Sequence, residues 1–134
     1  METVFEKLYT FYGMRTLEEA DPEFHPYYEG AMEKRDMAYH QGTVWTFPLG
    51  AYYLAYLKVH AYSERAKQDV KEQLEVLECA LKEGCIGQLP EIYDGKNPVS
   101  SKGCFAQAWS VGELLRVYEQ IEKRRNRTWN LKGE

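Results

Sequence analysis

The sequence predicts an all-α fold of about four helices joined by two long loops. In several segments the apolar residues recur at the spacing of a helix, and no segment shows the alternating pattern of a half-buried strand. Two stretches between these segments concentrate glycine and proline, which interrupt regular structure. The 134 residues, of which 44% are hydrophobic, are enough for one domain with a core of its own.

The first predicted helix covers residues 2–12 and ends before Gly13, a residue type that commonly stops a helix. Its apolar side chains at helical spacing are Val4, Leu8 and Phe11. Residues 14–41 show no sustained period and contain several proline and glycine breaks, so we expect the first long loop there, with one short turn. The tyrosines of this stretch, including Tyr27 and Tyr28, favour an ordered loop because disordered linkers contain few aromatic residues.

Two adjacent segments predict the central helices. Residues 44–60 are apolar on nearly every side and have Pro48 near the start, which is typical of a helix enclosed by others. The next helix begins after Ser63, a good N-terminal cap, and ends before Gly84. One face of this helix carries an aliphatic stripe opposite a charged face: Val70, Leu74, Leu77 and Leu81.

The second long loop is predicted over residues 84–103. This stretch contains glycine or proline at six positions, with Glu91 and Asp94 near its centre. A last helix is expected from about Phe105 to Arg125, before a polar tail. Its apolar face consists of Ala108, Val111, Leu115, Tyr118 and Ile121.

The charge balance argues against nucleic acids and membranes as partners. Seventeen basic and 21 acidic residues give a net charge of −4, so the field that would attract a phosphate backbone or an anionic membrane is missing. The uncharged window between Asp36 and Lys58 invites a membrane interpretation, but His40, Gln41 and Pro48 interrupt any spanning run.

The cysteines predict neither a zinc site nor a disulfide framework. Cys79, Cys85 and Cys104 form no CxxC pair and have no histidine at short range. The first residues also lack the basic start and continuous apolar middle of a secretory signal. We therefore expect a protein of the reducing cytoplasm, with no metal or other cofactor.

Aromatic residues make up 14% of the chain, with eleven tyrosines and three tryptophans. Such rings combine an apolar face with a polar edge and can bind sugars, although most of them are expected to fill a core. Three short segments place these rings and hydrogen-bonding groups close to predicted helix starts: residues 39–45, 87–95 and 104–110.

These three segments supply the candidate site residues: His40, Gln41, Trp45, Glu91, Asp94, Gln107 and Trp109. Glu91 follows a proline and has apolar neighbours, and a partly desolvated carboxylate can activate water. Structural roles remain open at this point. His40 could be a satisfied structural histidine, Trp45 a core residue, and Glu91 a helix cap. Asp94 with the glycine that follows could be an ordinary turn.

Taken together, three segments resemble the C-terminal end of glycogen debranching enzymes, in the amylo-α-1,6-glucosidase domain. They read AYHQGTVWTFPLGAY, GCIGQLPEIYDG and KGCFAQAWSVGELLRV, and they occur in the order and approximate spacing of that family. The upstream stretch TFYGMRTLEEADPEFHPYYEG is also similar, so the resemblance covers most of residues 9–120. One departure is Thr46, because the family commonly has proline directly after the motif tryptophan.

The resemblance implies a glucoamylase-like (α/α)6 toroid, of which residues 1–134 would form a single C-terminal fragment with about four helices. It also implies an inverting hydrolysis of α-1,6-glucosidic branch stubs, with Glu91 as the general base and Asp94 as a less favoured alternative. His40, Gln41, Trp45, Gln107 and Trp109 would line the glucose pocket. The general acid would belong to upstream helices, since no second carboxylate here lies in a comparable motif.

The implied partners are glycogen or a branched α-glucan oligosaccharide, and the remaining part of a debranching enzyme. Self-association is also expected, because a partial toroid would expose apolar surface. Three other interpretations remain open: a non-catalytic carbohydrate-binding module, a helical protein-interaction module, and another toroid hydrolase, such as a trehalase-like enzyme.

Overall fold

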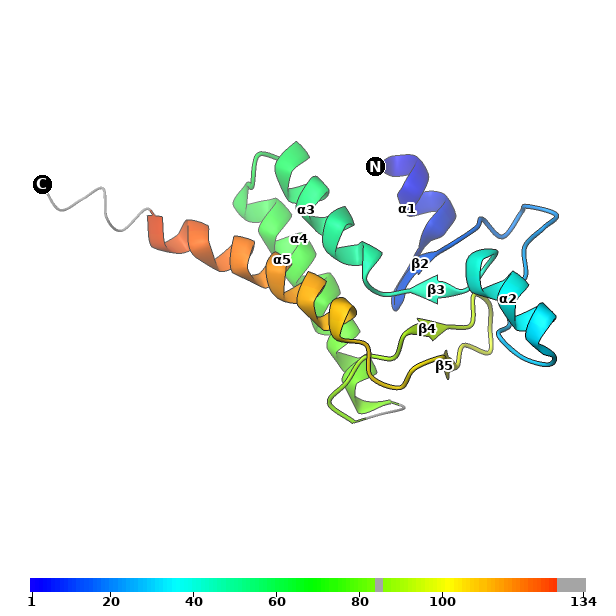
Figure 1. Cartoon of the computed structure of the whole chain (residues 1–134). Helices are drawn as coiled ribbons and strands as arrows, with labels where there is room; N and C mark the ends of the chain where they lie inside the picture. Colours follow the sequence, from blue (N-terminus) through cyan, green and yellow to red (C-terminus); the bar gives the residue numbers. More distant parts are fainter. Residues whose placement is uncertain (84–85, 128–134) are drawn as a thin grey trace, which may run out of the picture.

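The computed structural model describes residues 1–83 and 86–127, and within these ranges the chain is mixed α/β (Figure 1). It contains five α-helices, one short 3-10 helix and a five-stranded antiparallel sheet. The prediction of an all-α fold, with four helices of a partial toroid, is therefore wrong. Cys85 lies outside the described residues, and the other two cysteines are free and exposed.

The elements follow one another along the chain as helices separated by very short strands. The helices are α1 (Glu2–Leu8), α2 (Met32–His40), α3 (Pro48–Val59), α4 (Glu64–Glu78), the 3-10 helix η1 (Cys79–Lys82) and α5 (Ala108–Arg127). The strands are β1 (Tyr9–Thr10), β2 (Gly13–Arg15), β3 (Val44–Trp45), β4 (Ile92–Tyr93) and β5 (Ser101–Lys102).

The sheet has the order β1-β2-β3-β4-β5, and every neighbouring pair is antiparallel. Trp45 lies opposite both Met14 and Ile92, so β3 joins the N-terminal hairpin to the segment that follows Glu91. No strand in the described part of the chain is longer than three residues, and two residues cannot display the alternation that identifies a strand in a sequence. The sheet was missed for this reason.

Helices α3, α4 and α5 pack together beside one end of the sheet, whereas α2 lies at the other end (Figure 1). The Ser63 side chain accepts a hydrogen bond from the backbone of Ala66 at 3.3 Å, which confirms the predicted cap of α4. The helical core is built from buried aliphatic and aromatic residues: Leu49, Tyr53, Leu57, Val70, Leu74, Leu77, Leu114 and Val117. The predicted stripe of α4 does supply this core, and Leu81 packs against it from η1.

Three predicted boundaries differ in the structure, two of them because of the sheet. The first helix ends at Leu8 rather than residue 12, since Tyr9 and Thr10 pair with β2. The central helix begins at Pro48 rather than residue 44, because Val44 and Trp45 form β3. The last helix begins at Ala108 rather than Phe105, and the two predicted loops contain α2, part of β2, and the strands β4 and β5.

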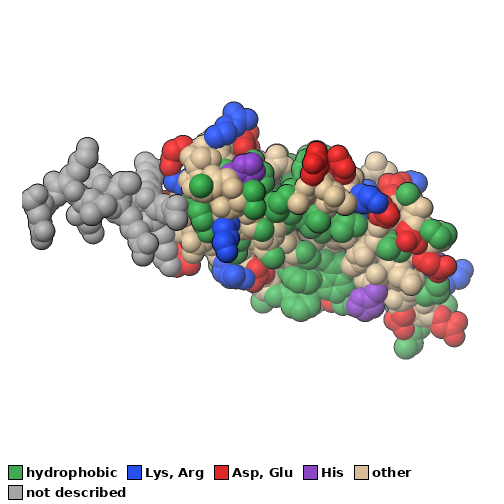
Figure 2. Space-filling model, turned by 90° about the horizontal axis from the view of Figure 1, so that it is seen from above, with side chains coloured by type: hydrophobic (Ala, Val, Ile, Leu, Met, Phe, Trp, Pro, Cys, Tyr) green, Lys and Arg blue, Asp and Glu red, His purple; other side chains and the backbone are tan. Residues whose placement is uncertain are grey.

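Helix α2 escaped prediction because it has no apolar stripe. Ala38 is its only residue that is fully buried, and most of its other side chains are exposed. Within the described residues, no helix is both long and apolar enough to cross a bilayer. Figure 2 shows hydrophobic side chains gathered in the middle of the face seen from above. The exposed large hydrophobic residues include Phe11, Phe105, Trp109 and Leu115.

Candidate functional site

Glu91 stands directly before β4, and both oxygens of its partly buried carboxylate accept hydrogen bonds. The Tyr39 hydroxyl donates to Oε1, and the backbone N–H of Cys104 donates to Oε2 at 2.9 Å. The Glu91 backbone N–H donates in turn to the Cys104 carbonyl at 2.8 Å. The carboxylate is therefore held in one orientation by the end of α2 and by the segment before α5.

Gly103 allows the Cys104 segment to approach this carboxylate. Its φ is +69°, a left-handed conformation that side chains rarely adopt, and a Cβ atom here would lie 2.5 Å from Glu91 Oε2. A larger residue would push the backbone donor of Cys104 away from the carboxylate. The glycine in this segment is thus part of how Glu91 is positioned.

Four aromatic rings contact one another in a series that begins at Tyr39, the side-chain donor to Glu91, and we call Tyr39, Trp45, Phe47 and Trp109 the aromatic cluster. The Tyr39 and Trp45 rings meet edge to face at a centroid distance of 4.6 Å. Trp45 is 6.0 Å from Trp109, and Phe47 is 4.7 Å from Trp109. Because Tyr39 also donates to Glu91, the cluster and the carboxylate form one continuous site.

The two tryptophans of this cluster differ in exposure. Trp45 is only 6% exposed, and its indole N–H donates to the Tyr39 carbonyl at 3.1 Å and to Thr43 Oγ1 at 3.2 Å. Trp109, in the first turn of α5, is 48% exposed. Trp45 therefore anchors the site from inside, whereas Trp109 presents a ring to solvent.

His40 is the last residue of α2, and Gln41 follows it. Both come directly after Tyr39 of the aromatic cluster in the sequence. His40 is exposed, and its ring stands edge-on to Tyr39 at 4.9 Å. The Gln41 carbonyl accepts from the backbone N–H of His25 at 2.6 Å, which ties this segment to the preceding loop. The side-chain oxygen of Gln41 is buried and has no hydrogen-bond partner among the described residues. It is an acceptor without a protein donor.

Asp94 has a different environment from Glu91. It is 3% exposed, its Oδ1 accepts from the Tyr28 backbone N–H at 3.1 Å, and its Oδ2 lies 3.7 Å from Lys102 Nζ. Its own N–H donates to the Ser100 carbonyl at 3.0 Å. These contacts join three segments of the fold, which is what a structural turn residue does.

Backbone contact joins two of the sequence segments at Gly42 and Gly95. A Cβ atom on Gly95 would lie 2.0 Å from the Gly42 carbonyl oxygen, so the two segments cross without room for a side chain. The Gly95 N–H also donates to the Pro26 carbonyl at 2.7 Å. This crossing fixes how far the His40-Gln41 segment lies from the Glu91-Asp94 segment.

Gln107 lies directly before α5, and backbone hydrogen bonds hold it there. Its N–H donates to the Leu89 carbonyl at 2.8 Å, and its carbonyl accepts from the Ser110 N–H at 3.2 Å. The side chain of Gln107 is partly buried. All three sequence segments thus meet in space, through hydrogen bonds or ring contacts.

Tyr39 was not among the predicted site residues, and neither was Phe47. Burial first, then the hydrogen bond to Glu91 and the charge of that carboxylate, raise the pKa of Tyr39 to about 12. Tyr39 therefore remains a protonated donor at neutral pH. Its position directly before His40 was the available signal, but no spacing in the sequence relates residue 39 to residue 91.

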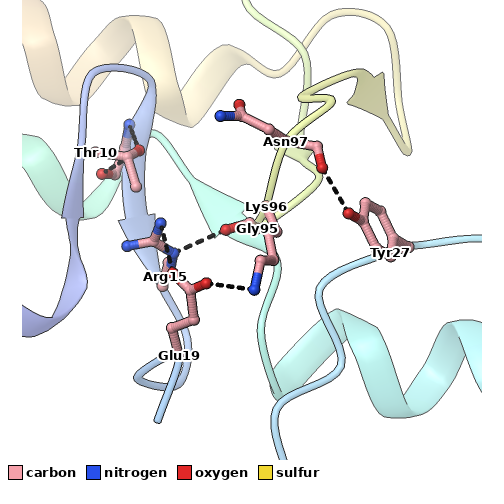
Figure 3. Close-up of polar contacts among 8 residues, drawn as sticks. Thr10, Arg15, Glu19, Tyr27, Gly95, Lys96 and Asn97 are labelled. Carbon is pink, nitrogen blue, oxygen red and sulfur yellow. Dashed lines mark hydrogen bonds and ion pairs between the residues drawn. The ribbon is translucent and has the colours of Figure 1, made fainter.

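A hollow of about 690 Å³ lies elsewhere, between the β1–β2 hairpin and the loop after β4. Arg15 Nε donates to the Gly95 carbonyl at 2.8 Å, and Lys96 Nζ lies 2.6 Å from Glu19 (Figure 3). Val44 lines this hollow, whereas the next residue, Trp45, belongs to the aromatic cluster. Successive residues of a strand face opposite sides, so the hollow and the aromatic cluster lie on opposite faces of β3.

Acidic, histidine and cysteine side chains do not gather into a metal site in the part of the chain that the structure describes. Asp94 is the one predicted site residue among those that line the hollow. The chemistry available beside the aromatic cluster is that of a held carboxylate, a phenol, an exposed imidazole and an unpaired amide oxygen.

The chain is similar to a family of known proteins. The family model described as amylo-alpha-1,6-glucosidase matches residues 1–116, which include all seven predicted site residues and the whole of the aromatic cluster. No match was found among curated proteins. The match indicates the C-terminal region of a glycogen debranching enzyme, a region of glycoside hydrolase type. Because the match covers most of its length, the chain belongs to the amylo-alpha-1,6-glucosidase family.

Proposed function

We propose that Glu91 is the general base in an inverting hydrolysis of α-1,6-linked glucosyl stubs on a branched glucan. The observation that carries this proposal is the Glu91 carboxylate, held by the Tyr39 hydroxyl and the Cys104 N–H beside the aromatic cluster. A base must point at one water molecule, and fixed donors on both oxygens set that direction. The family match supports a glucan as the substrate class.

In the proposed reaction, Glu91 removes a proton from water as the water oxygen attacks the anomeric carbon. The bond from that carbon to the glycosidic oxygen breaks, and a second carboxylic acid gives this oxygen its proton. A carboxylate oxygen has two lone pairs, so each oxygen of Glu91 keeps one lone pair for water after its existing hydrogen bond. In inverting enzymes the two carboxyl groups are about 6.5–9.5 Å apart, which leaves room for the water.

The glucosyl unit would lie against the aromatic cluster. Trp109 offers a half-exposed ring for stacking, while Trp45 supports it from inside. Sugar hydroxyls could then pair with the exposed ring of His40. The side-chain oxygen of Gln41 is buried, so we place Gln41 in this pocket on the resemblance alone. We assign Gln107 to the same pocket on the resemblance alone, and we assign Asp94 to the scaffold because protein contacts occupy both its oxygens.

The proposed reaction needs an acid that this chain does not supply in a comparable motif. We propose that it comes from the remaining part of a debranching enzyme, which would also be the main protein partner of these residues. Glycogen or a branched oligosaccharide in the cytoplasm is then the substrate. Self-association through exposed apolar residues stays a prediction.

The first test is activity in a debranching enzyme that carries this segment. We expect Glu91→Gln to lower kcat on an α-1,6-glucosyl-substituted maltooligosaccharide by orders of magnitude, because the amide cannot accept the proton. Glu29→Gln, a change at an exposed acid, is the matched control and should leave turnover as it was. Turnover close to normal in Glu91→Gln would exclude Glu91 as the base. The purified 134-residue chain should be inactive on the same substrate.

The second test uses the 134-residue chain and 1-deoxynojirimycin, a glucose-shaped cation. The Glu91 carboxylate should attract this cation, so binding measured by calorimetry should weaken about tenfold or more in Glu91→Gln. The half-exposed ring of Trp109 also favours a second function, non-catalytic glucan binding. Under that alternative, maltotriose binds the unaltered chain and the Glu91→Gln variant equally well, and only Trp109→Ala weakens binding.

A further inference from the structure

We infer that Tyr39 is a positioning residue for Glu91, and that its hydroxyl fixes the direction of the carboxylate. The inference deepens the proposed function and rests on it, since a base is positioned for a reaction. It starts from the pair of donors on the carboxylate, of which only one is a side chain. Tyr39 Oη donates to Oε1, and the backbone of Cys104 donates to Oε2.

The Tyr39 side chain is itself held on several sides. Its ring meets Trp45 edge to face at 4.6 Å and lies 5.8 Å from the Tyr28 ring. Its backbone carbonyl accepts hydrogen bonds from the Trp45 indole at 3.1 Å and from Thr43 Oγ1 at 3.0 Å. These contacts fix both ends of the residue, so the hydroxyl is presented to Glu91 from a rigid support.

The two donors together restrict rotation of the carboxylate. With the Cys104 N–H alone, the group could turn about its last bond and offer either oxygen to water. The Tyr39 hydroxyl on the other oxygen removes that freedom and leaves one lone pair on each oxygen in a defined direction.

The same contact acts on Tyr39 in return. Burial is the largest cause of its raised pKa, followed by the hydrogen bond to Glu91 and the negative charge of that carboxylate. Tyr118 offers a matched comparison within the same chain, since its hydroxyl donates to Glu78 Oε1 at 2.7 Å, and burial followed by that carboxylate raises its pKa. The two tyrosine–glutamate pairs can therefore be followed in one experiment.

The experiment is an NMR measurement on the 134-residue chain at about pH 7, with ¹³C-labelled glutamate carboxyls and tyrosine rings. In Tyr39→Phe, the Glu91 carboxyl signal should move, because Oε1 has lost its side-chain donor and the carboxylate can turn. In Tyr118→Phe, the Glu91 signal should stay where it is in the unaltered chain. An unchanged Glu91 signal in Tyr39→Phe would overturn the inference.

Glu91→Gln provides the reciprocal measurement and keeps Tyr39 in place if Tyr39→Phe does not fold. The Tyr39 ring signal should begin to ionise at lower pH in this variant, while the Tyr118 signal stays unchanged. Equal movement of both tyrosines, or of neither, would contradict a specific Tyr39–Glu91 contact. These NMR measurements need no substrate. They can therefore support the Tyr39–Glu91 contact where the hydrolysis and binding tests of the proposed function fail, and those tests can succeed where the NMR measurements fail.

Discussion

The helical side of the molecule and the side that carries the site are stabilised in different ways. Helices α3, α4 and α5 pack through buried aliphatic side chains such as Leu57, Leu74 and Val117. Around Glu91, the segments are held by hydrogen bonds to backbone groups and by the crossing of Gly42 and Gly95. Apolar packing tolerates adjustment, whereas these polar and steric contacts specify particular distances.

The largest change in stability is expected on the helical side. Leu74 is 1% exposed in the core, so Leu74→Ala should lower the free energy of unfolding by about 3 kcal/mol, through lost burial and the cavity left behind. Urea unfolding measures this, and Leu115→Ala at an exposed position is the control. If both variants lost the same free energy of unfolding, buried apolar packing would not be what stabilises the helical side.

On the other side, one methyl group should damage the site. Gly95→Ala places a carbon 2.0 Å from the Gly42 carbonyl oxygen, and separating the two backbones should cost about 2 kcal/mol. The Tyr39 and Glu91 NMR signals should shift in this variant, although neither residue is altered.

Gly112→Ala is the matched control for that change. A Cβ at residue 112 would have nothing within 4 Å, and the residue lies inside α5. This substitution should raise the free energy of unfolding by about 0.5–1 kcal/mol, because alanine restricts the unfolded chain and favours a helix. If both alanine variants behaved alike, the crossing would not be a tight contact.

A smaller effect is expected at the start of α4. Ser63→Ala removes the side-chain acceptor of the Ala66 N–H and should cost about 1 kcal/mol by thermal or urea unfolding. Ser63→Asn keeps an acceptor and should retain most of the stability. Equal losses in both variants would show that the hydrogen bond to the Ala66 N–H is not the source of the stability.

The smallest effect is expected at an exposed ion pair on the site side. Lys96 pairs with Glu19 at 2.6 Å, but both side chains are about half exposed, so solvent screens the pair and Lys96→Ala should leave the midpoint of urea unfolding almost unchanged. A midpoint that falls as far as in Ser63→Ala would mean that surface charges, and not backbone contacts, hold this region together.

The same difference explains what the sequence could predict. The aliphatic stripe and Ser63 cap of α4 produce a clear periodic signal, and the structure confirms that helix. The two-residue strands are too short to carry such a signal, and α2 has no apolar stripe. Strand β3 is stabilised by pairing with β2 and β4, which lie far from it in the sequence. The pattern of neighbouring residues in a sequence does not indicate a strand partner that lies tens of residues away.

For the site, short motifs placed Glu91, Trp45 and Trp109 in the same region, but they did not show which groups would hold the carboxylate. Tyr39 contacts Glu91 across 52 positions, and Cys104 acts through its backbone, which any residue other than proline possesses. Periodicity and composition are silent on both contacts. The roles of the seven predicted residues stay a prediction that the experiments above address.

The two-residue strand β3 also restricts insertions and deletions in the segment that precedes it. Val44 faces the hollow and Trp45 faces the aromatic cluster, so the loss or gain of one residue between α2 and β3 would exchange them. The indole would then enter a space lined by Arg15 and Lys96, and an isopropyl group would stand beside Trp109. A change of length in that connection would therefore disturb both faces of β3 at once, and Gly42 within it leaves no room for a side chain, since a Cβ there would lie 2.6 Å from the His25 carbonyl oxygen.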